Sequence, residues 1–254
     1  MSAGAGSESR GEMTLLEHLA ELRAVLLHSI LAVGACSVAA WFVSERAVEW
    51  LVDPAIAAAG ELVFLSPTGA FMLRMKTALG LGTFVAVPFV LWRVWSFVVP
   101  GLFQRERRIF VPVLLGSLSL FYVGVAFAYF VILPISLVFL LGFGTENLRP
   151  MLSAEHYFDF AIRISLAFGA VFQFPLVVGL LTYWEVLAPD FLSRYWRYGV
   201  VAVFVISAIL TPPDVASQLL MAGPVLLLYL VSIGVARWIA RTKGTARTSS
   251  DQSK

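Results

Sequence analysis

Long apolar stretches alternate with short polar segments along the whole chain. A membrane-spanning helix needs about 20 mainly apolar residues, because it rises about 1.5 Å per residue through a hydrocarbon core about 30 Å thick. Six stretches qualify or nearly qualify: 24–43, 77–99, 109–133, 160–184, 198–213 and 215–236. We therefore predict an all-α integral membrane protein with six transmembrane helices.

Prolines mark two of the expected boundaries. The fifth and sixth stretches are short and are separated only by Thr211-Pro212-Pro213-Asp214. One re-entrant hairpin is conceivable there, but two prolines favour two brief helices joined by a tight turn. We also expect the third span to end at Pro134, with residues 135–145 lying along the outer surface.

The segments before, between and after the spans have distinct patterns. Leucines recur at helical spacing in residues 12–23, which predicts an amphipathic approach helix along the membrane surface. The outer loop 44–76 contains Pro54 and is long enough to form a folded cap. We divide the chain into an N-terminal segment 1–23, a membrane domain 24–236 and a polar, disordered tail 237–254.

Composition agrees with a membrane protein and excludes several other classes. Hydrophobic residues make up 59% of the chain and charged residues only 13%, and the mean hydropathy is +0.87. The net charge of +2 gives no reason to expect a nucleic-acid partner. A single cysteine, Cys36, excludes an intrachain disulfide and a cysteine-rich metal site.

The distribution of arginine and lysine predicts the orientation. Six spans place both termini on one side of the membrane, and most of the 18 basic residues fall on that side. Because cytoplasmic loops carry the excess of Lys and Arg, we expect both termini in the cytoplasm of a multi-pass protein of the cell membrane.

Catalytic motifs are missing from the sequence. Its three histidines form no His-Glu-x-x-His pair, and neither a Gly-x-Ser-x-Gly elbow nor a Walker loop occurs. We therefore expect no enzyme, no cofactor and no metal site. His28, inside the first span, is expected to make a polar contact between helices.

Two glutamines stand out inside apolar stretches. Gln173 lies at the centre of the fourth span, and Gln218 lies near the outer end of the sixth. An amide in the membrane needs a hydrogen-bond partner, so Gln173 should face either another helix or a wet cavity.

Two clusters of charge lie on the cytoplasmic side: Glu17-His18-Leu19-Ala20-Glu21-Leu22-Arg23 and Gln104-Arg105-Glu106-Arg107-Arg108. Helical geometry turns Glu21 and Arg23 about 200° apart, so we expect no close pair between them. Glu106 could simply pair with its arginine neighbours in a solvated loop. The functional alternative is that Glu21 and Glu106 both bind guanidinium groups of an incoming basic peptide.

Seven ordered blocks, spread over residues 13–238, resemble the TatC family, the polytopic receptor subunit of the twin-arginine protein translocase. They are Glu17-His18-Leu19-Ala20-Glu21-Leu22-Arg23; Ser66-Pro67 with Phe71 and Lys76; Pro100-Gly101-Leu102; Glu106-Arg107-Arg108; Phe127-Ala128-Tyr129-Phe130; Phe168-Gly169 with Phe172-Gln173-Phe174-Pro175; and Thr211-Pro212-Pro213-Asp214 with Ser217-Gln218.

The resemblance implies a concave, glove-like bundle that binds twin-arginine signal peptides of folded cargo. It further implies transport powered by the proton motive force, with TatA- and TatB-like single-span subunits, other TatC copies and the lipid bilayer as partners. Glu21 and Glu106 would contact the paired arginines, with Arg23 shaping the same surface and Phe97 flanking it. Two further positions, Pro54 and Asp214, match residues of the family pattern.

The chain departs from the family pattern at Gln173, where many relatives have glutamate. An amide can hydrogen-bond a neighbouring helix but cannot carry charge, so an ionic role at this position is in doubt. A secondary transporter for a small solute is the alternative function. It would predict an internal repeat, and we find no convincing one.

Overall fold

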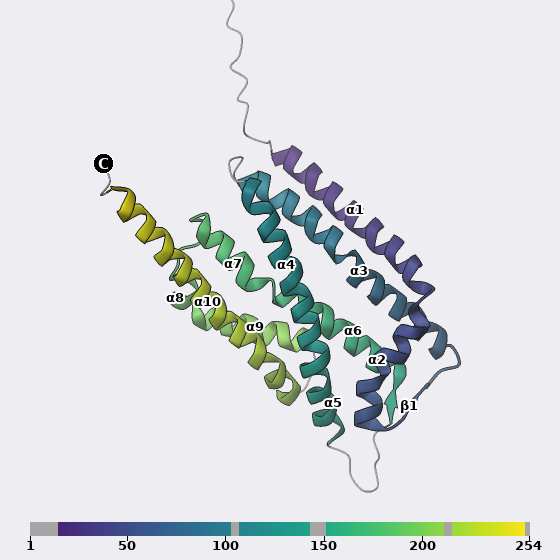
Figure 1. Ribbon diagram of the computed structural model, residues 1–254. Coiled ribbons are helices and arrows are strands. Elements are labelled where there is room, and N and C mark those ends of the chain that lie inside the picture. The colour runs from purple at the N-terminus through teal and green to yellow at the C-terminus, as the bar shows by residue number, and fades with distance from the viewer. Residues whose placement is uncertain (1–14, 103–106, 143–150, 211–214, 252–254) are drawn as a thin grey trace, which may run out of the picture.

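The computed structural model describes residues 15–102, 107–142, 151–210 and 215–251, and nearly all of them are helical (Figure 1). The elements are α1 (Leu15–Trp41), α2 (Ser44–Ala59), β1 (Leu62–Val63), α3 (Gly69–Leu102), α4 (Arg107–Phe127), the π-helical turn η1 (Ala128–Ile132), α5 (Leu133–Leu141), β2 (Leu152–Ser153), α6 (Ala154–Val171), α7 (Phe174–Tyr183), α8 (Phe191–Arg194), α9 (Trp196–Leu210) and α10 (Val215–Asp251).

Helices long and apolar enough to cross a membrane account for most of the described chain. There are five in the described residues: Glu17–Trp41, Gly69–Val98, Phe110–Leu141, Ala154–Tyr183 and Gln218–Thr242. A sixth apolar helix, α9, is shorter, with 15 residues. Large apolar side chains remain exposed on the outer helices, for example Ile30 at 67% and Leu227 at 61%, as expected where lipid is the solvent. The all-helical membrane architecture is confirmed.

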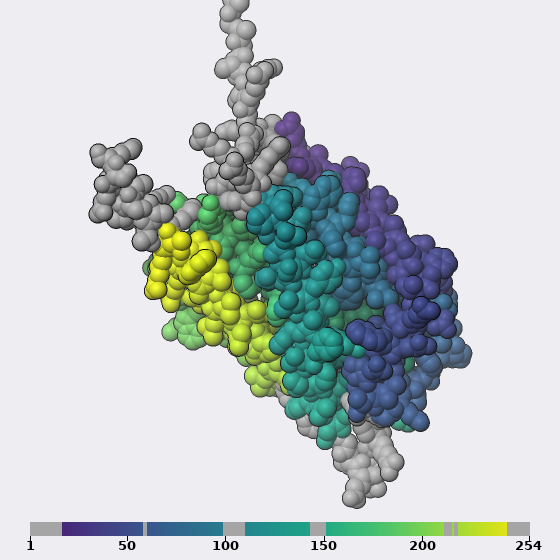
Figure 2. All heavy atoms as spheres, in the orientation of Figure 1, coloured from purple at the N-terminus to yellow at the C-terminus, as the bar shows by residue number. Residues whose placement is uncertain are grey.

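The bundle has two distinct ends (Figure 1). The first turn of α1 and the last turns of α10 lie at one end, which we call the terminal end. At the opposite end α2 packs beside β1, and we call this the cap end. From the side shown in Figure 2, α1, α4 and α10 contribute to one continuous surface.

Two helices run on where we expected a break. The expected approach helix and the first span form one helix, α1, because neither glycine nor proline occurs between Leu15 and Gly34. Similarly, α10 continues to Asp251, past residue 237 where we expected the tail to begin. Alanine, arginine and lysine favour helix in this polar segment.

The expected end of the third span at Pro134 is wrong. A single apolar helix extends from Phe110 to Leu141, and Pro134 lies in the first turn of α5. Proline lacks the N–H that the preceding turn would bond and crowds that turn's carbonyl. The wider π-helical turn η1, placed just before Pro134, accommodates both effects and lets the helix continue.

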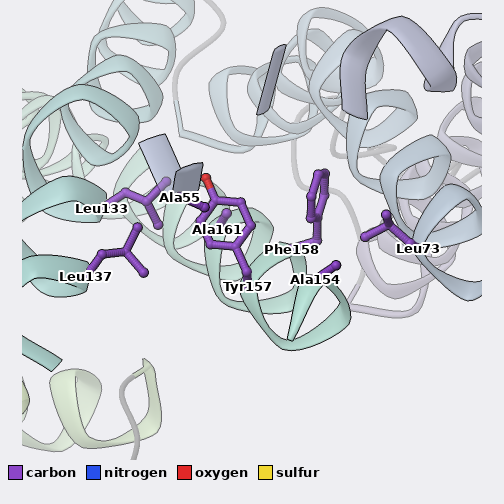
Figure 3. Packing of buried hydrophobic residues seen from close by; sticks show 8 residues of the cluster. All are labelled: Ala55, Leu73, Leu133, Leu137, Ala154, Tyr157, Phe158 and Ala161. Atoms are coloured by element: carbon purple, nitrogen blue, oxygen red, sulfur yellow. The ribbon is translucent and has the colours of Figure 1, made fainter. Parts of the chain in front are cut away.

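The outer loop forms the folded cap that we expected. Its helix α2 packs against α5, and β1 pairs in parallel with β2, matching Leu62 to Leu152 and Val63 to Ser153. Beneath it lies a buried cluster drawn from α2, α3, α5 and α6 (Figure 3): Ala55, Leu73, Leu133, Leu137, Ala154, Tyr157, Phe158 and Ala161. Tyr157 closes the cluster by donating its hydroxyl to the Leu51 carbonyl at 2.6 Å.

Glycine allows the closest helix contacts at two crossings. A Cβ added to Gly82 of α3 would lie 2.4 Å from the backbone N of Ser37 on α1. One added to Gly124 of α4 would lie 2.6 Å from the carbonyl oxygen of Phe168 on α6. These glycines therefore set how near α1 and α6 come to their neighbours.

Candidate functional site

At the terminal end, α1 lies against the last turns of α3. The ring of His18 stacks on the ring of Phe97, with centroids 4.3 Å apart and an interplanar angle of 15°. Glu21 follows His18 by three residues, so both side chains lie on the same side of α1. The fold therefore places half-buried Glu21 on the side of α1 that faces Phe97.

Glu21 has no salt-bridge partner among the described side chains, which do not include those of residues 99–109. Arg23, the nearest cation in sequence, is exposed and makes no ion pair with it, as the helical spacing predicts.

Glu106 lies outside the described residues, and so does Asp214. Glu106 falls between the end of α3 at Leu102 and the start of α4 at Arg107. Its proximity to Glu21 remains a prediction.

Gln173 pairs with α4 at the break between α6 and α7. Ser117 Oγ donates to Gln173 Oε1 at 2.6 Å, and Gln173 Nε2 donates to the Ser117 carbonyl at 2.9 Å. We expected Gln173 to face either another helix or a wet cavity, and these hydrogen bonds support the contact with another helix.

Hollows lie on both sides of Gln173. One, with about 580 Å³ of empty volume, is lined by residues of α3 and α7, including Trp95, Trp184 and Gln173 itself. The other, with about 930 Å³, lies among α7, α9 and α10 and again includes Gln173 together with Tyr229. Both are almost entirely apolar, which suits apolar segments of a peptide or a partner helix.

The remaining two candidate residues lie toward the cap end. Gln218 Nε2 donates to the Phe204 carbonyl at 3.0 Å and so links α10 to α9. Pro54 lies inside α2 rather than in a loop. Gln218 thus has a structural contact between helices, and Pro54 has a place within a helix.

Sequence reasoning missed the environment of Arg93. Its Nη2 lies 3.3 Å from His28 Nδ1, while that nitrogen also lies 2.5 Å from the Ala24 carbonyl oxygen. A carbonyl oxygen only accepts, so Nδ1 donates to Ala24 and cannot also accept from Arg93. The contact between helices that we expected for His28 is therefore a close approach to Arg93 of α3 without a hydrogen bond, and the helical spacing of α1 alone could not reveal this neighbour.

Comparison with known proteins identifies the family. Residues 17–224 match the family model described as Sec-independent protein translocase protein (TatC). The chain belongs to the TatC family. Among curated relatives, the TatC of Carboxydothermus hydrogenoformans is 40% identical over 228 residues, covering 89% of this chain and 94% of its own length. The TatC of Aquifex aeolicus is 40% identical over 235 residues, covering 91% and 98%.

Solved TatC structures share the fold. A crystal structure of a twin-arginine translocase receptor TatC superposes with a TM-score of 0.82 at 39% identity, covering 88% of this chain and all of that one. A second, determined in the detergent DDM, gives 0.80 at 40% identity and covers 87% and 99%. Family membership makes this chain a multi-span component of a protein translocase, a transport subunit rather than a member of an enzyme family.

Proposed function

We propose that the chain is the receptor subunit of a twin-arginine translocase and that it binds signal peptides at its terminal end. In this proposal Glu21 and Glu106 accept hydrogen bonds from the paired arginines. Arg23 shapes the surrounding surface, and Phe97 flanks it. The terminal end then faces the cytoplasm, in agreement with the excess of Lys and Arg there.

The observation that carries the proposal is the environment of Glu21. It is half-buried on the side of α1 where His18 stacks on Phe97, and it has no ion-pair partner among the described side chains. A carboxylate on a rigid helix can bind a planar guanidinium through two parallel hydrogen bonds, which an ammonium cannot reproduce. This geometry favours arginine over lysine.

The apolar hollows beside Gln173 suit the apolar part of the signal peptide and the single-span partner helices. We infer that the apolar part of the signal peptide passes from the terminal end into this region, and that TatA- and TatB-like single-span helices pack nearby. Further TatC copies complete the complex, which the proton motive force drives in the cell membrane. Pro54, Gln173, Asp214 and Gln218 then have structural or partner-contact roles.

Peptide capture tests the receptor role. The full chain is purified with a twin-arginine signal peptide, and each of Glu21→Ala and Glu106→Ala is compared with wild type. We expect both variants to lose at least tenfold in bound peptide while keeping normal abundance in the membrane, because a buried arginine would be left without its acceptor. Glu61→Ala, which removes an exposed carboxylate at the cap end, is the matched control.

Cross-linking tests the contact itself. In a Cys36→Ala background, single cysteines beside the two carboxylates, at positions 20 and 105, should cross-link to a twin-arginine peptide and far less to a matched lysine-pair peptide, because Glu21 and Glu106 are retained. Unchanged peptide capture by both alanine variants, or equal cross-linking of the two peptides, would contradict the proposed site.

A further inference from the structure

A third hollow lies at the cap end, far along the bundle from Glu21. It has about 860 Å³ of empty volume and opens where α1 ends and where α2 and α3 begin. Unlike the hollows beside Gln173, it combines aromatic and charged side chains: Trp41, Glu45, Glu49, Phe64, Phe71 and Arg74.

Arg74 forms the positive wall of this hollow. Its guanidinium carbon lies 5.1 Å from the centre of the Trp41 ring, and its Nε donates to Ser44 Oγ at 3.2 Å. Nη2 is 3.7 Å from Glu45 Oε2, which is long for a hydrogen bond. The guanidinium is therefore held in place by neighbours while its side chain stays 40% exposed, so N–H groups remain for an anion.

Glu49 forms the negative wall. It lies one helical turn after Glu45 and shares its side of α2. Its side chain has no hydrogen-bond or ion-pair partner among the described residues. The rings of Phe64 and Phe71, which are 51% and 56% exposed, line the same hollow. A carboxylate beside aromatic rings is an environment that binds ammonium groups.

The hollow lies at the depth of the membrane boundary, where lipid headgroups are found. The first span ends at Trp41 and the second begins at Gly69, so the hollow lies at the boundary of the apolar helices. Phe42 and Leu65, which directly follow the lining residues Trp41 and Phe64 in the chain, are 79% and 70% exposed. Apolar surface at this level faces lipid, and lipid headgroups lie beside it.

We propose that this hollow binds the headgroup of a phospholipid that carries both a phosphate and a primary ammonium, as phosphatidylethanolamine does. Arg74 binds the phosphate, and Glu49 accepts hydrogen bonds from the ammonium between Phe64 and Phe71. A headgroup without an ammonium leaves the Glu49 carboxylate unpaired. A choline headgroup keeps the charge but has no N–H to donate.

Native mass spectrometry of the full-length protein tests the proposal. Equal amounts of phosphatidylethanolamine, phosphatidylcholine and phosphatidylglycerol with identical acyl chains are added in detergent, and bound lipid is counted. We expect the ethanolamine lipid to bind about fivefold more than either competitor, and Glu49→Gln to remove most of that preference, as for loss of one partly exposed charge-assisted hydrogen bond. Glu61→Gln, also exposed at the cap end, should leave it unchanged.

The outcomes separate this proposal from the receptor role. Equal binding of the three lipids, or a preference that survives Glu49→Gln, would overturn it. A photo-cross-linker at position 49 that captures a protein in native membranes, and no lipid, would assign the hollow to a protein partner instead. Neither outcome bears on signal-peptide capture, since Glu21 lies at the other end of the bundle.

Discussion

Tyr129 donates its hydroxyl to the carbonyl oxygen of Trp50 at 3.0 Å, and the two rings stack with centroids 5.6 Å apart. Trp50 lies four residues before Pro54, within the same helix α2. Proline has no N–H, so it cannot satisfy that carbonyl in the usual helical way. The hydroxyl of Tyr129 replaces the missing donor and fastens the cap helix to the third span.

We expect Tyr129→Phe to lower the free energy of unfolding by about 1 kcal/mol, because it removes the donor but keeps the ring. Thermal unfolding of the purified protein in detergent measures the effect. Tyr198→Phe, which alters an exposed tyrosine whose hydroxyl has no hydrogen-bond partner among the described residues, serves as the control. In a Pro54→Ala background, where the helix regains its N–H, Tyr129→Phe should cost clearly less; an equal cost in both backgrounds would refute the proline argument.

The crossing of α1 and α3 should be intolerant of any side chain at position 82. Gly82→Ala places a methyl group 2.4 Å from the Ser37 backbone, which cannot move aside as a flexible side chain would. We expect a loss of about 1–3 kcal/mol, seen as a lower unfolding temperature and lower yield of folded protein. Gly34→Ala, where an added Cβ meets nothing within 4 Å, should be neutral or stabilising. Equal behaviour of the two variants would show that α1 and α3 do not cross so closely.

Gln173→Glu distinguishes a dry contact from a wet cavity. A carboxylate can still accept from Ser117 Oγ, but it cannot donate to the Ser117 carbonyl, where the amide now donates at 2.9 Å. We expect a loss of about 1–3 kcal/mol in stability near neutral pH, measured as a shift in unfolding temperature. An unchanged temperature would mean that water replaces the lost donor.

The ion pair between Lys76 and Asp159 joins α3 to α6 at 2.7 Å. Both side chains are more than a third exposed, at 36% and 39%, so screening limits the interaction. A double-mutant cycle of Lys76→Met and Asp159→Asn should give a coupling energy of about 1 kcal/mol or less. Coupling well above that value would show that lipid, rather than water, surrounds the pair.

The sequence alone determined the membrane class, the approximate positions of the spans apart from the end of the third, and the family. The class and the spans follow from the lengths of the apolar stretches, and the family follows from short blocks of neighbouring residues. The directions of side chains close together in one helix, such as Glu21 and Arg23, are likewise fixed by helical geometry. The folded cap was likewise predictable, because a long loop containing Pro54 needs internal structure.

Only the tertiary structure decided which distant residues meet. The pairs His18–Phe97, Ser117–Gln173 and Tyr129–Trp50 join different helices. Their encounter depends on how closely and at what rotation those helices pack, which glycines such as Gly82 control. The continuation of the third span through Pro134 was equally hidden, because a π-helical turn leaves no mark in a hydropathy pattern.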